Sequence, residues 1–150
     1  MKPARKFGAI FPVRISSVIF CVADTHTIIW YLSRDNRLST TAKQYMETNV
    51  LRGDQIGISS ITLVEMVYLI EKGRIPAESL SNLATQFSSQ ASMFIEVPLD
   101  LQITRTLSKV SSVQIPDMPD RIIAATALYL HVPLISRDGK ILISSIQTIW

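Results

Sequence analysis

The segment that most constrains the fold is residues 116–138, PDMPDRIIAATALYLHVPLISRD. It begins with a turn that carries two aspartates, continues as the run 122–130, in which Thr126 is the only strongly polar residue, and ends in a short apolar segment before a third aspartate. A helix that is apolar nearly all round needs cover on several sides, and VPLIS is typical of a buried parallel strand. The pattern therefore predicts a helix with an acidic start followed by a strand with an acidic tip.

Two acids belong to the start of this predicted helix. Pro119 is tolerated in a first helical turn because its missing N–H would have no intrahelical partner, and Asp117, just before that turn, can cap the helix. Asp120 then lies in the first turn. Ligands of parallel α/β sheets bind beyond the carboxyl ends of the strands, and both the start of this helix and Asp138, at the strand tip, are expected at that edge.

The rest of the chain alternates between strand-like and helix-like segments, which implies an α/β fold with a parallel sheet. Strands are predicted at 17–23, 55–60, 93–99 and 132–136, with a short turn of helix and an edge strand in the tail 141–150. Helices are predicted at 25–32, 38–49, 62–75, 77–90 and 100–110. Thr62 and Glu65 have the spacing of a capping box, which would put Glu65 in the first turn of its helix, and Gly73 is expected to close that helix.

Residues 1–17 are predicted to be a basic extension, and residues 18–150 a single domain. The first fourteen residues hold four basic residues and no acid; without them the chain has 11 basic and 12 acidic residues, so the net charge of +3 does not point to nucleic acid. The extension reads as a basic arm, as the result of a start codon placed too early, or as the beginning of a signal peptide cleaved after Ala23. Pro12 and Arg14 interrupt its apolar run and disfavour the signal peptide.

Composition adds three expectations. The single cysteine, Cys21, excludes an internal disulfide and favours a cytoplasmic protein. Hydrophobic residues make up 47% of the chain and charged residues only 18%, so we expect an apolar surface for a partner, with 30–32 and 66–70 as the candidate segments. No apolar run approaches the length of a membrane helix, and no membrane association is expected.

Four acids share one feature of position, because each follows a predicted strand or starts a predicted helix. They are Asp24, Glu65, Asp120 and Asp138. Each alone is explained as a cap, half of a capping box or a turn residue. Together they are expected at one edge of one sheet, where mutual repulsion would raise their pKa values unless a cation lay between them. An all-oxygen ligand set favours Mg²⁺ or Mn²⁺ over zinc.

Such an ion polarises a phosphate and activates a water for in-line attack, so phosphodiester hydrolysis is the predicted chemistry. Two other classes stay open. One is a phosphoacceptor or phosphatase domain, although His26 stands where the phosphatase pattern needs a second acid, and the late strand ends in Ser136, Arg137 and Asp138 with no lysine. The other is an interaction module in which the acids are only caps. Absence of Mn²⁺ binding would favour that module.

Several stretches together resemble the acidic segments of PIN-domain ribonucleases, especially the VapC-type toxins of toxin–antitoxin pairs. They are VADTHTIIWYL, SSITLVEMVYLIEKGRI and PDMPDRIIAATALYL with LISRDGKI after it. The motifs are specific in this order, and the resemblance covers residues 18–150. It implies a three-layer α/β/α fold with a mainly parallel sheet, Mg²⁺- or Mn²⁺-dependent cleavage of RNA, a homodimer, and inhibition by an antitoxin protein.

By matching positions, the resemblance gives the catalytic and metal-binding roles to four acids: Asp24, Glu65, Asp120 and Asp138. It suggests auxiliary roles for Asp117, the extra acid of a DxxDR pattern, and for Ser136, near the metal-binding acids. Arg121, next to the acidic helix start, either neutralises it or contacts a phosphate. The chain departs from the family in its basic extension and in the absence of a basic surface on its body, which leaves the residues that bind RNA unidentified.

Overall fold

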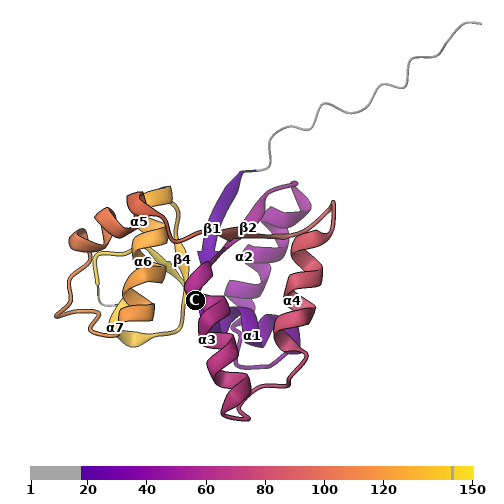
Figure 1. Ribbon diagram of the computed structural model, residues 1–150. Coiled ribbons are helices and arrows are strands. Elements are labelled where there is room, and N and C mark those ends of the chain that lie inside the picture. The colour runs from indigo at the N-terminus through magenta and orange to yellow at the C-terminus, as the bar shows by residue number, and fades with distance from the viewer. Residues whose placement is uncertain (1–17, 143) are drawn as a thin grey trace, which may run out of the picture.

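A computed structural model describes residues 18–142 and 144–150 (Figure 1). The predicted extension, 1–17, lies outside the described residues. The elements follow one another as β1 (Ile19–Ala23), α1 (Thr25–Ser33), α2 (Thr40–Leu51), β2 (Gln55–Ser59), α3 (Ser60–Glu71), α4 (Ser79–Ser88), β3 (Phe94–Val97), α5 (Leu101–Thr106), a 3-10 turn η1 (Leu107–Lys109), α6 (Met118–Leu130), β4 (Leu134–Ile135), α7 (Gly139–Leu142) and β5 (Thr148–Ile149).

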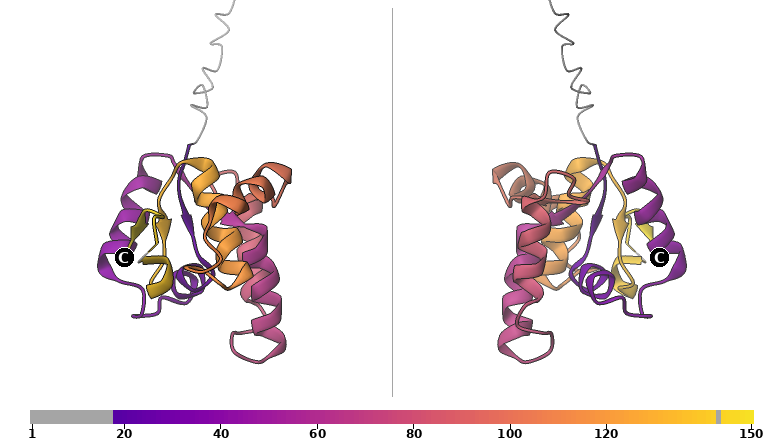
Figure 2. Two further views of the ribbon diagram at one scale, coloured as in Figure 1. Left: turned by 90° about the vertical axis from the view of Figure 1, so that its left-hand side faces the viewer. Right: turned by 90° about the vertical axis from the view of Figure 1, so that its right-hand side faces the viewer.

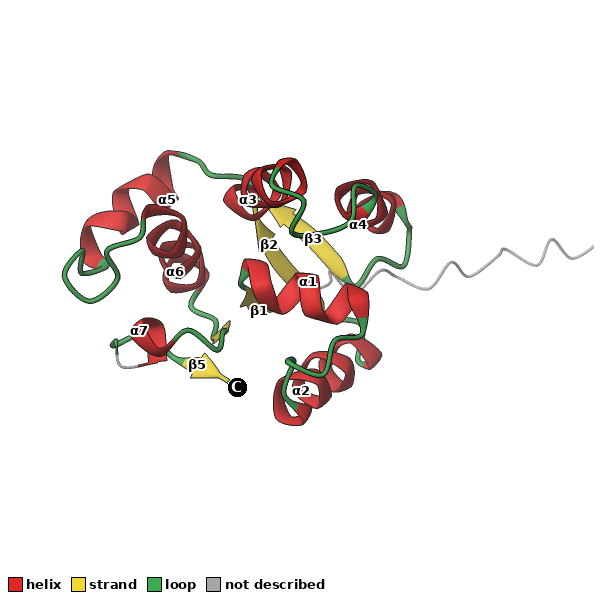
Figure 3. Ribbon diagram, turned by 90° about the horizontal axis from the view of Figure 1, so that it is seen from below, coloured by secondary structure: helices red, strands yellow, loops and turns green. Residues whose placement is uncertain are grey.

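The five strands form one sheet in the order β3-β2-β1-β4-β5, and every pair of neighbours is parallel. The first strand of the chain is therefore the central one. β1 runs downward in Figure 1 and leads directly into α1, so the lower edge of the sheet in that view carries the carboxyl ends of the strands. Figure 3 looks onto this edge from below.

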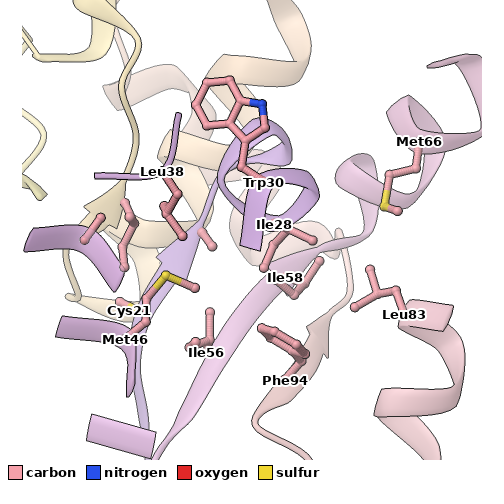
Figure 4. Close-up of a cluster of buried hydrophobic side chains, with 13 residues drawn as sticks. Cys21, Ile28, Trp30, Leu38, Met46, Ile56, Ile58, Met66, Leu83 and Phe94 are labelled. Carbon is pink, nitrogen blue, oxygen red and sulfur yellow. The ribbon is translucent and has the colours of Figure 1, made fainter. Parts of the chain in front are cut away.

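Helices cover both faces of the sheet, as the side views show with α2 and α6 on opposite sides of β1 (Figure 2). One buried cluster packs α1, α2 and α4 against the sheet through residues such as Ile28, Met46 and Leu83 (Figure 4). A second cluster packs α5 and α6 against the other face. Neighbouring β1 residues alternate between the two, since Cys21 belongs to the first and Val22 to the second, as the pleat of a strand requires. The predicted three-layer α/β/α fold is confirmed.

Three predicted helix starts are confirmed, each with its acid as the cap. The side chain of Asp24 accepts a hydrogen bond from the backbone of the third residue of α1, at 2.9 Å. Asp117 accepts one from the N–H of Asp120 at 3.2 Å, with Pro119 inside the first turn of α6. Asp100 caps α5 in the same way at 3.0 Å. The acids are thus fixed at helix starts by local hydrogen bonds.

The capping box predicted at the start of α3 is wrong. The helix begins earlier, because the side chain of Ser59 supplies the cap. Thr62 is buried within the helix, and Glu65 lies in its second turn rather than its first. The end of the helix agrees with prediction, since Gly73 follows it with a φ of +65°, a conformation that glycine adopts without strain.

The segments expected to form a partner surface, 30–32 and 66–70, combine core side chains with exposed ones. The side chains of Trp30 and Met66 are 8% and 0% exposed. Exposed apolar side chains in this region lie on the outer face of α3, which we define by Val64, Val67 and Tyr68. No helix in the described part of the chain combines the length and apolar character needed to cross a bilayer.

Candidate functional site

A pocket of about 550 Å³ at the carboxyl edge of the sheet brings all four predicted acids together. Its lining comprises Asp24, Thr25, His26, Trp30, Arg37, Glu65, Asp117, Asp120, Arg137 and Asp138. Five of these ten side chains are carboxylates. Two larger hollows, of about 1120 and 750 Å³, have only two carboxylates each in their lining. We therefore place the chemistry in the smaller, acidic pocket.

Asp24 stands at the point where β1 becomes α1 and is 7% exposed. Its backbone N–H donates to the carbonyl of Ile135 in β4 at 3.1 Å, and its side chain accepts from Thr27. Burial raises the pKa of the Asp24 carboxyl, while hydrogen bonds from Ser136 and Thr27 lower it. These donors hold the carboxylate in one orientation and favour its ionised form against the cost of burial.

Ser136 connects two of the acids. Its side chain is fully buried, and its oxygen accepts a hydrogen bond from the backbone N–H of Asp138 at 3.0 Å. Its hydrogen bond to Asp24 is among the contacts that lower the pKa of that carboxyl. Ser136 therefore lies where the turn after β4 meets the end of β1, as expected for a residue that supports the acids.

Glu65 is half-buried and is positioned by Thr25. The Thr25 hydroxyl donates to Oε1 of Glu65 at 2.6 Å. Since a threonine hydroxyl has a single proton, its second contact, 3.1 Å to the hydroxyl of Thr62, is one in which Thr25 accepts. Burial and the charge of Asp117 raise the pKa of Glu65, and the hydrogen bond from Thr25 lowers it.

Asp120 shows the electrostatic strain that the sequence predicted. Burial, as the largest cause, and the charges of Asp117, Asp138, Glu65 and Asp24, in that order of size, together raise the pKa of its carboxyl to about 7. The ordinary pKa of an aspartate is 3.8. With a pKa of about 7 in the folded protein, Asp120 is about half protonated near neutral pH when no cation occupies the pocket. A cation among these acids would favour ionisation of all of them.

The donor set fits a hard divalent cation. Its potential ligands are carboxylate oxygens, with an exposed histidine, His26, at the border. Among the described residues, no three histidine, cysteine, aspartate or glutamate side chains form a ready-made metal shell. Mg²⁺ usually keeps several waters, so carboxylates can hold it through those waters as well as directly.

Arg121 is not part of this pocket. Its Nη2 donates to the carbonyls of Leu107 and Val110, both at 3.1 Å, and its Nε is buried without a hydrogen-bond partner. These bonds tie α6 to the turn after α5. The proposed contact of Arg121 with the acids or with a phosphate therefore finds no support in its position.

Five lining residues were not assigned to the site from the sequence, namely Thr25, His26, Trp30, Arg37 and Arg137. Thr25, His26 and Arg137 stand inside the DTH and SRD motifs, close to acids, and that proximity was a usable signal. Trp30 belongs to the segment 30–32, which was expected at a partner surface, but its side chain is buried. Arg37 carries no local signal, because only the folded turn after α1 brings it to the pocket.

The PIN domain family model matches residues 21–143, which include every acid of the pocket. The chain belongs to the PIN-domain family. Proteins of this family are generally nucleases. No curated protein matches the sequence at the threshold of the comparison.

Several solved structures share the fold. A chain of VapBC2 from Rickettsia felis, in a complex bound to promoter DNA, superposes with a TM-score of 0.64 at 17% identity, covering 87% of this chain and 97% of that one. A chain of VapBC-1 from nontypeable Haemophilus influenzae superposes with a TM-score of 0.60 at 21% identity, covering 87% of this chain and 96% of that one. For a chain of FitAcB from Neisseria gonorrhoeae the TM-score is 0.58 at 16% identity, covering 86% of this chain and 96% of that one.

Proposed function

We propose that this PIN domain is a metal-dependent endoribonuclease and the toxin of a toxin–antitoxin pair. The observation that carries the proposal is the convergence of five carboxylates, from four separate segments, on one pocket at the carboxyl edge of the sheet. Capping accounts for Asp24 and Asp117 but not for Glu65, which lies in the second turn of α3 and still lines the pocket. Burial and the charges of the other four carboxylates raise the pKa of Asp120, so a cation bound among them would relieve their repulsion.

The residues proposed to hold Mg²⁺ or Mn²⁺, directly or through its waters, are Asp24, Glu65, Asp120 and Asp138. The ion, when bound, would polarise the phosphodiester and lower the pKa of an attacking water. Ser136 orients Asp24 and favours its ionised form against the cost of burial, and Thr25 orients Glu65. Asp120, about half protonated near neutral pH in the metal-free pocket, would lose that proton when an ion binds, since ligation requires the carboxylate. Asp117 caps α6 and contributes negative charge at the entrance of the pocket.

The proposed partners are an RNA substrate, an antitoxin protein and a second copy of the chain. Support for the antitoxin comes from the motifs and from the VapBC and FitAB complexes that share the fold. The outer face of α3 is the apolar surface we propose for protein contact, because its three side chains are between 41% and 61% exposed.

Calorimetric titration with Mn²⁺, followed by incubation with single-stranded RNA, tests this function. We expect Glu65→Gln to abolish both the binding heat and the cleavage. Glu71→Gln is the matched control, because Glu71 is an exposed acid on the same helix outside the pocket, and it should leave both unchanged. If the unaltered protein binds no Mn²⁺ and its melting temperature is the same in EDTA, the chain is a silent interaction module and the proposal fails.

A further inference from the structure

The acidic pocket also contains two arginines. Arg37 comes from the loop between α1 and α2, and Arg137 lies between Ser136 and Asp138 in the turn after β4. Both are exposed, although the body of the chain is nearly neutral. Two positive side chains therefore stand at the place where five carboxylates also meet.

Both guanidinium groups lie over the same ring. The Cζ atoms of Arg37 and Arg137 are 5.1 Å and 5.6 Å from the centroid of the Trp30 indole. Because Trp30 is anchored in the core beneath them (Figure 4), its ring is a fixed surface that limits the movement of both side chains. A cation over a tryptophan face is attracted by the ring quadrupole, which favours these positions further.

Arg37 is held in place a second time by Asp35. Its Nε donates to Oδ1 of Asp35 at 3.0 Å and its Nη2 to Oδ2 at 2.7 Å. The bonds from Arg37 lower the pKa of Asp35 to about 2, so the pair stays ionised at any pH near neutrality. This fork uses one edge of the guanidinium and leaves its other N–H donors for a ligand.

Arg137 has no carboxylate partner. The Arg37–Asp35 contact is the single ion pair in residues 18–142 and 144–150, so Arg137 is unpaired even though it lines a pocket with five acids. An exposed arginine beside carboxylates that it does not pair with is available to bind an external anion. The planar fork of arginine matches the oxygens of a phosphate.

We propose that Arg37, Arg137 and Trp30 form a phosphate-binding rim that holds the backbone of single-stranded RNA, so that the neighbouring phosphodiester reaches the acids. The proposal rests on the function proposed above and names the residues that would bind its substrate. A pocket of about 550 Å³ has the size of a small-molecule site, which accommodates nucleotides of one strand but not a duplex. Two local arginines also explain how a nearly neutral domain would bind a polyanion.

The test is the affinity of the full chain for a short, fluorescently labelled single-stranded RNA, measured by anisotropy in EDTA so that nothing is cleaved. We expect Arg37→Gln and Arg137→Gln each to weaken binding several-fold, and each to reduce the slope of log K against log salt by about 0.7, the value for one phosphate contact on a single strand. A duplex of the same sequence should bind more weakly than the single strand.

Arg52→Gln is the matched control. Arg52 is exposed and lies just before β2, at the amino edge of the sheet, and it lines none of the acidic pocket. The Arg52→Gln variant loses the same charge as the rim variants and should retain wild-type affinity for RNA. Equal losses in all three variants would reduce the effect to net charge and overturn the proposal.

Unchanged RNA affinity in both rim variants would also overturn the proposal, whether or not the protein cleaves RNA. If those variants in addition lost binding of poly-glutamate, the rim would be assigned to an acidic protein partner. If the wild-type protein proves unable to cleave RNA but the rim variants still lose RNA binding, the nuclease proposal is refuted and the rim proposal stands. The two proposals therefore fail separately.

Discussion

The hydroxyl of Thr25 donates a 2.6 Å hydrogen bond to Oε1 of Glu65, a residue 40 positions further along the chain. Thr25 is the first residue of α1 and follows Asp24 directly, so one dipeptide supplies an acid and also the donor that orients a second acid. The contact joins α1 to α3 at the pocket and is the closest link between the first and second acidic segments.

Replacing Thr25 with valine tests this link. Thr25→Val keeps the shape of the side chain but removes the donor, so we expect a loss of stability of about 1 kcal/mol. Mn²⁺ affinity should fall about 10- to 100-fold, the usual effect of losing a residue that orients a metal ligand. Calorimetry and urea unfolding measure the two effects. Thr85→Val removes an exposed hydroxyl that bonds only within its own helix and should change neither; wild-type metal affinity in Thr25→Val would contradict the assignment.

The pH dependence of stability tests the strain at Asp120. Its pKa in the folded protein, about 7, lies above its ordinary value of 3.8, so the folded state binds a proton that the unfolded chain releases between these values. The stability that this group contributes is fully present below the ordinary pKa and is lost as the pH rises through 7. Without metal, Asp120→Asn should therefore be more stable than the wild type at about pH 8, and the difference should vanish towards about pH 4.

Thermal unfolding in EDTA across this range measures the difference. Asp54→Asn changes an acid outside the pocket and should follow the wild-type curve. Saturating Mn²⁺ should reverse the order of stability at high pH, because a ligand stabilises only the protein that binds it. A difference between Asp120→Asn and the wild type that does not vary with pH would show that Asp120 is not strained.

Arg121→Met separates a structural role from a phosphate contact. The variant loses two charge-assisted hydrogen bonds to the carbonyls of Leu107 and Val110. We expect a loss of about 1.5–3 kcal/mol in the free energy of unfolding, with Mn²⁺ and RNA affinities unchanged at a temperature where the variant is folded. Weaker RNA binding with normal stability would return Arg121 to the site.

The parts of the site that could be predicted from the sequence are those with a local cause. Asp24 and Asp117 stand at helix starts marked by an apolar run or a proline, and sheet topology then places Asp24 and Asp138 at one edge. Glu65 was included for the wrong local reason, a capping box, and reaches the pocket because α3 starts at Ser60, directly after β2. Resemblance to a family, rather than helix chemistry, was the sound basis for including it.

Long-range placement accounts for what was missed. Arg37 reaches the pocket because Asp35 and Trp30 hold it there, and no periodicity or motif in the sequence encodes those two contacts. The near-neutral charge of the body was correct as a total but did not reveal that Arg37 and Arg137 stand together in the acidic pocket. In the same way, the expected apolar partner surface included the core residues Trp30 and Met66 beside the exposed Val67 and Tyr68.

The central position of β1 has a consequence for synthesis of the protein. The N–H of Asp24 bonds to Ile135, and β1 lies between β2 and β4, so the first strand to be translated remains without one neighbour until almost the whole chain exists. At about 5–20 residues per second, that wait lasts several seconds. A ribosome making this chain therefore carries the acids unassembled until β4 has left the exit tunnel, and a prematurely ended product lacks Asp138. Under the proposed function, this order of assembly would keep a nascent nuclease inactive next to the RNA that encodes it.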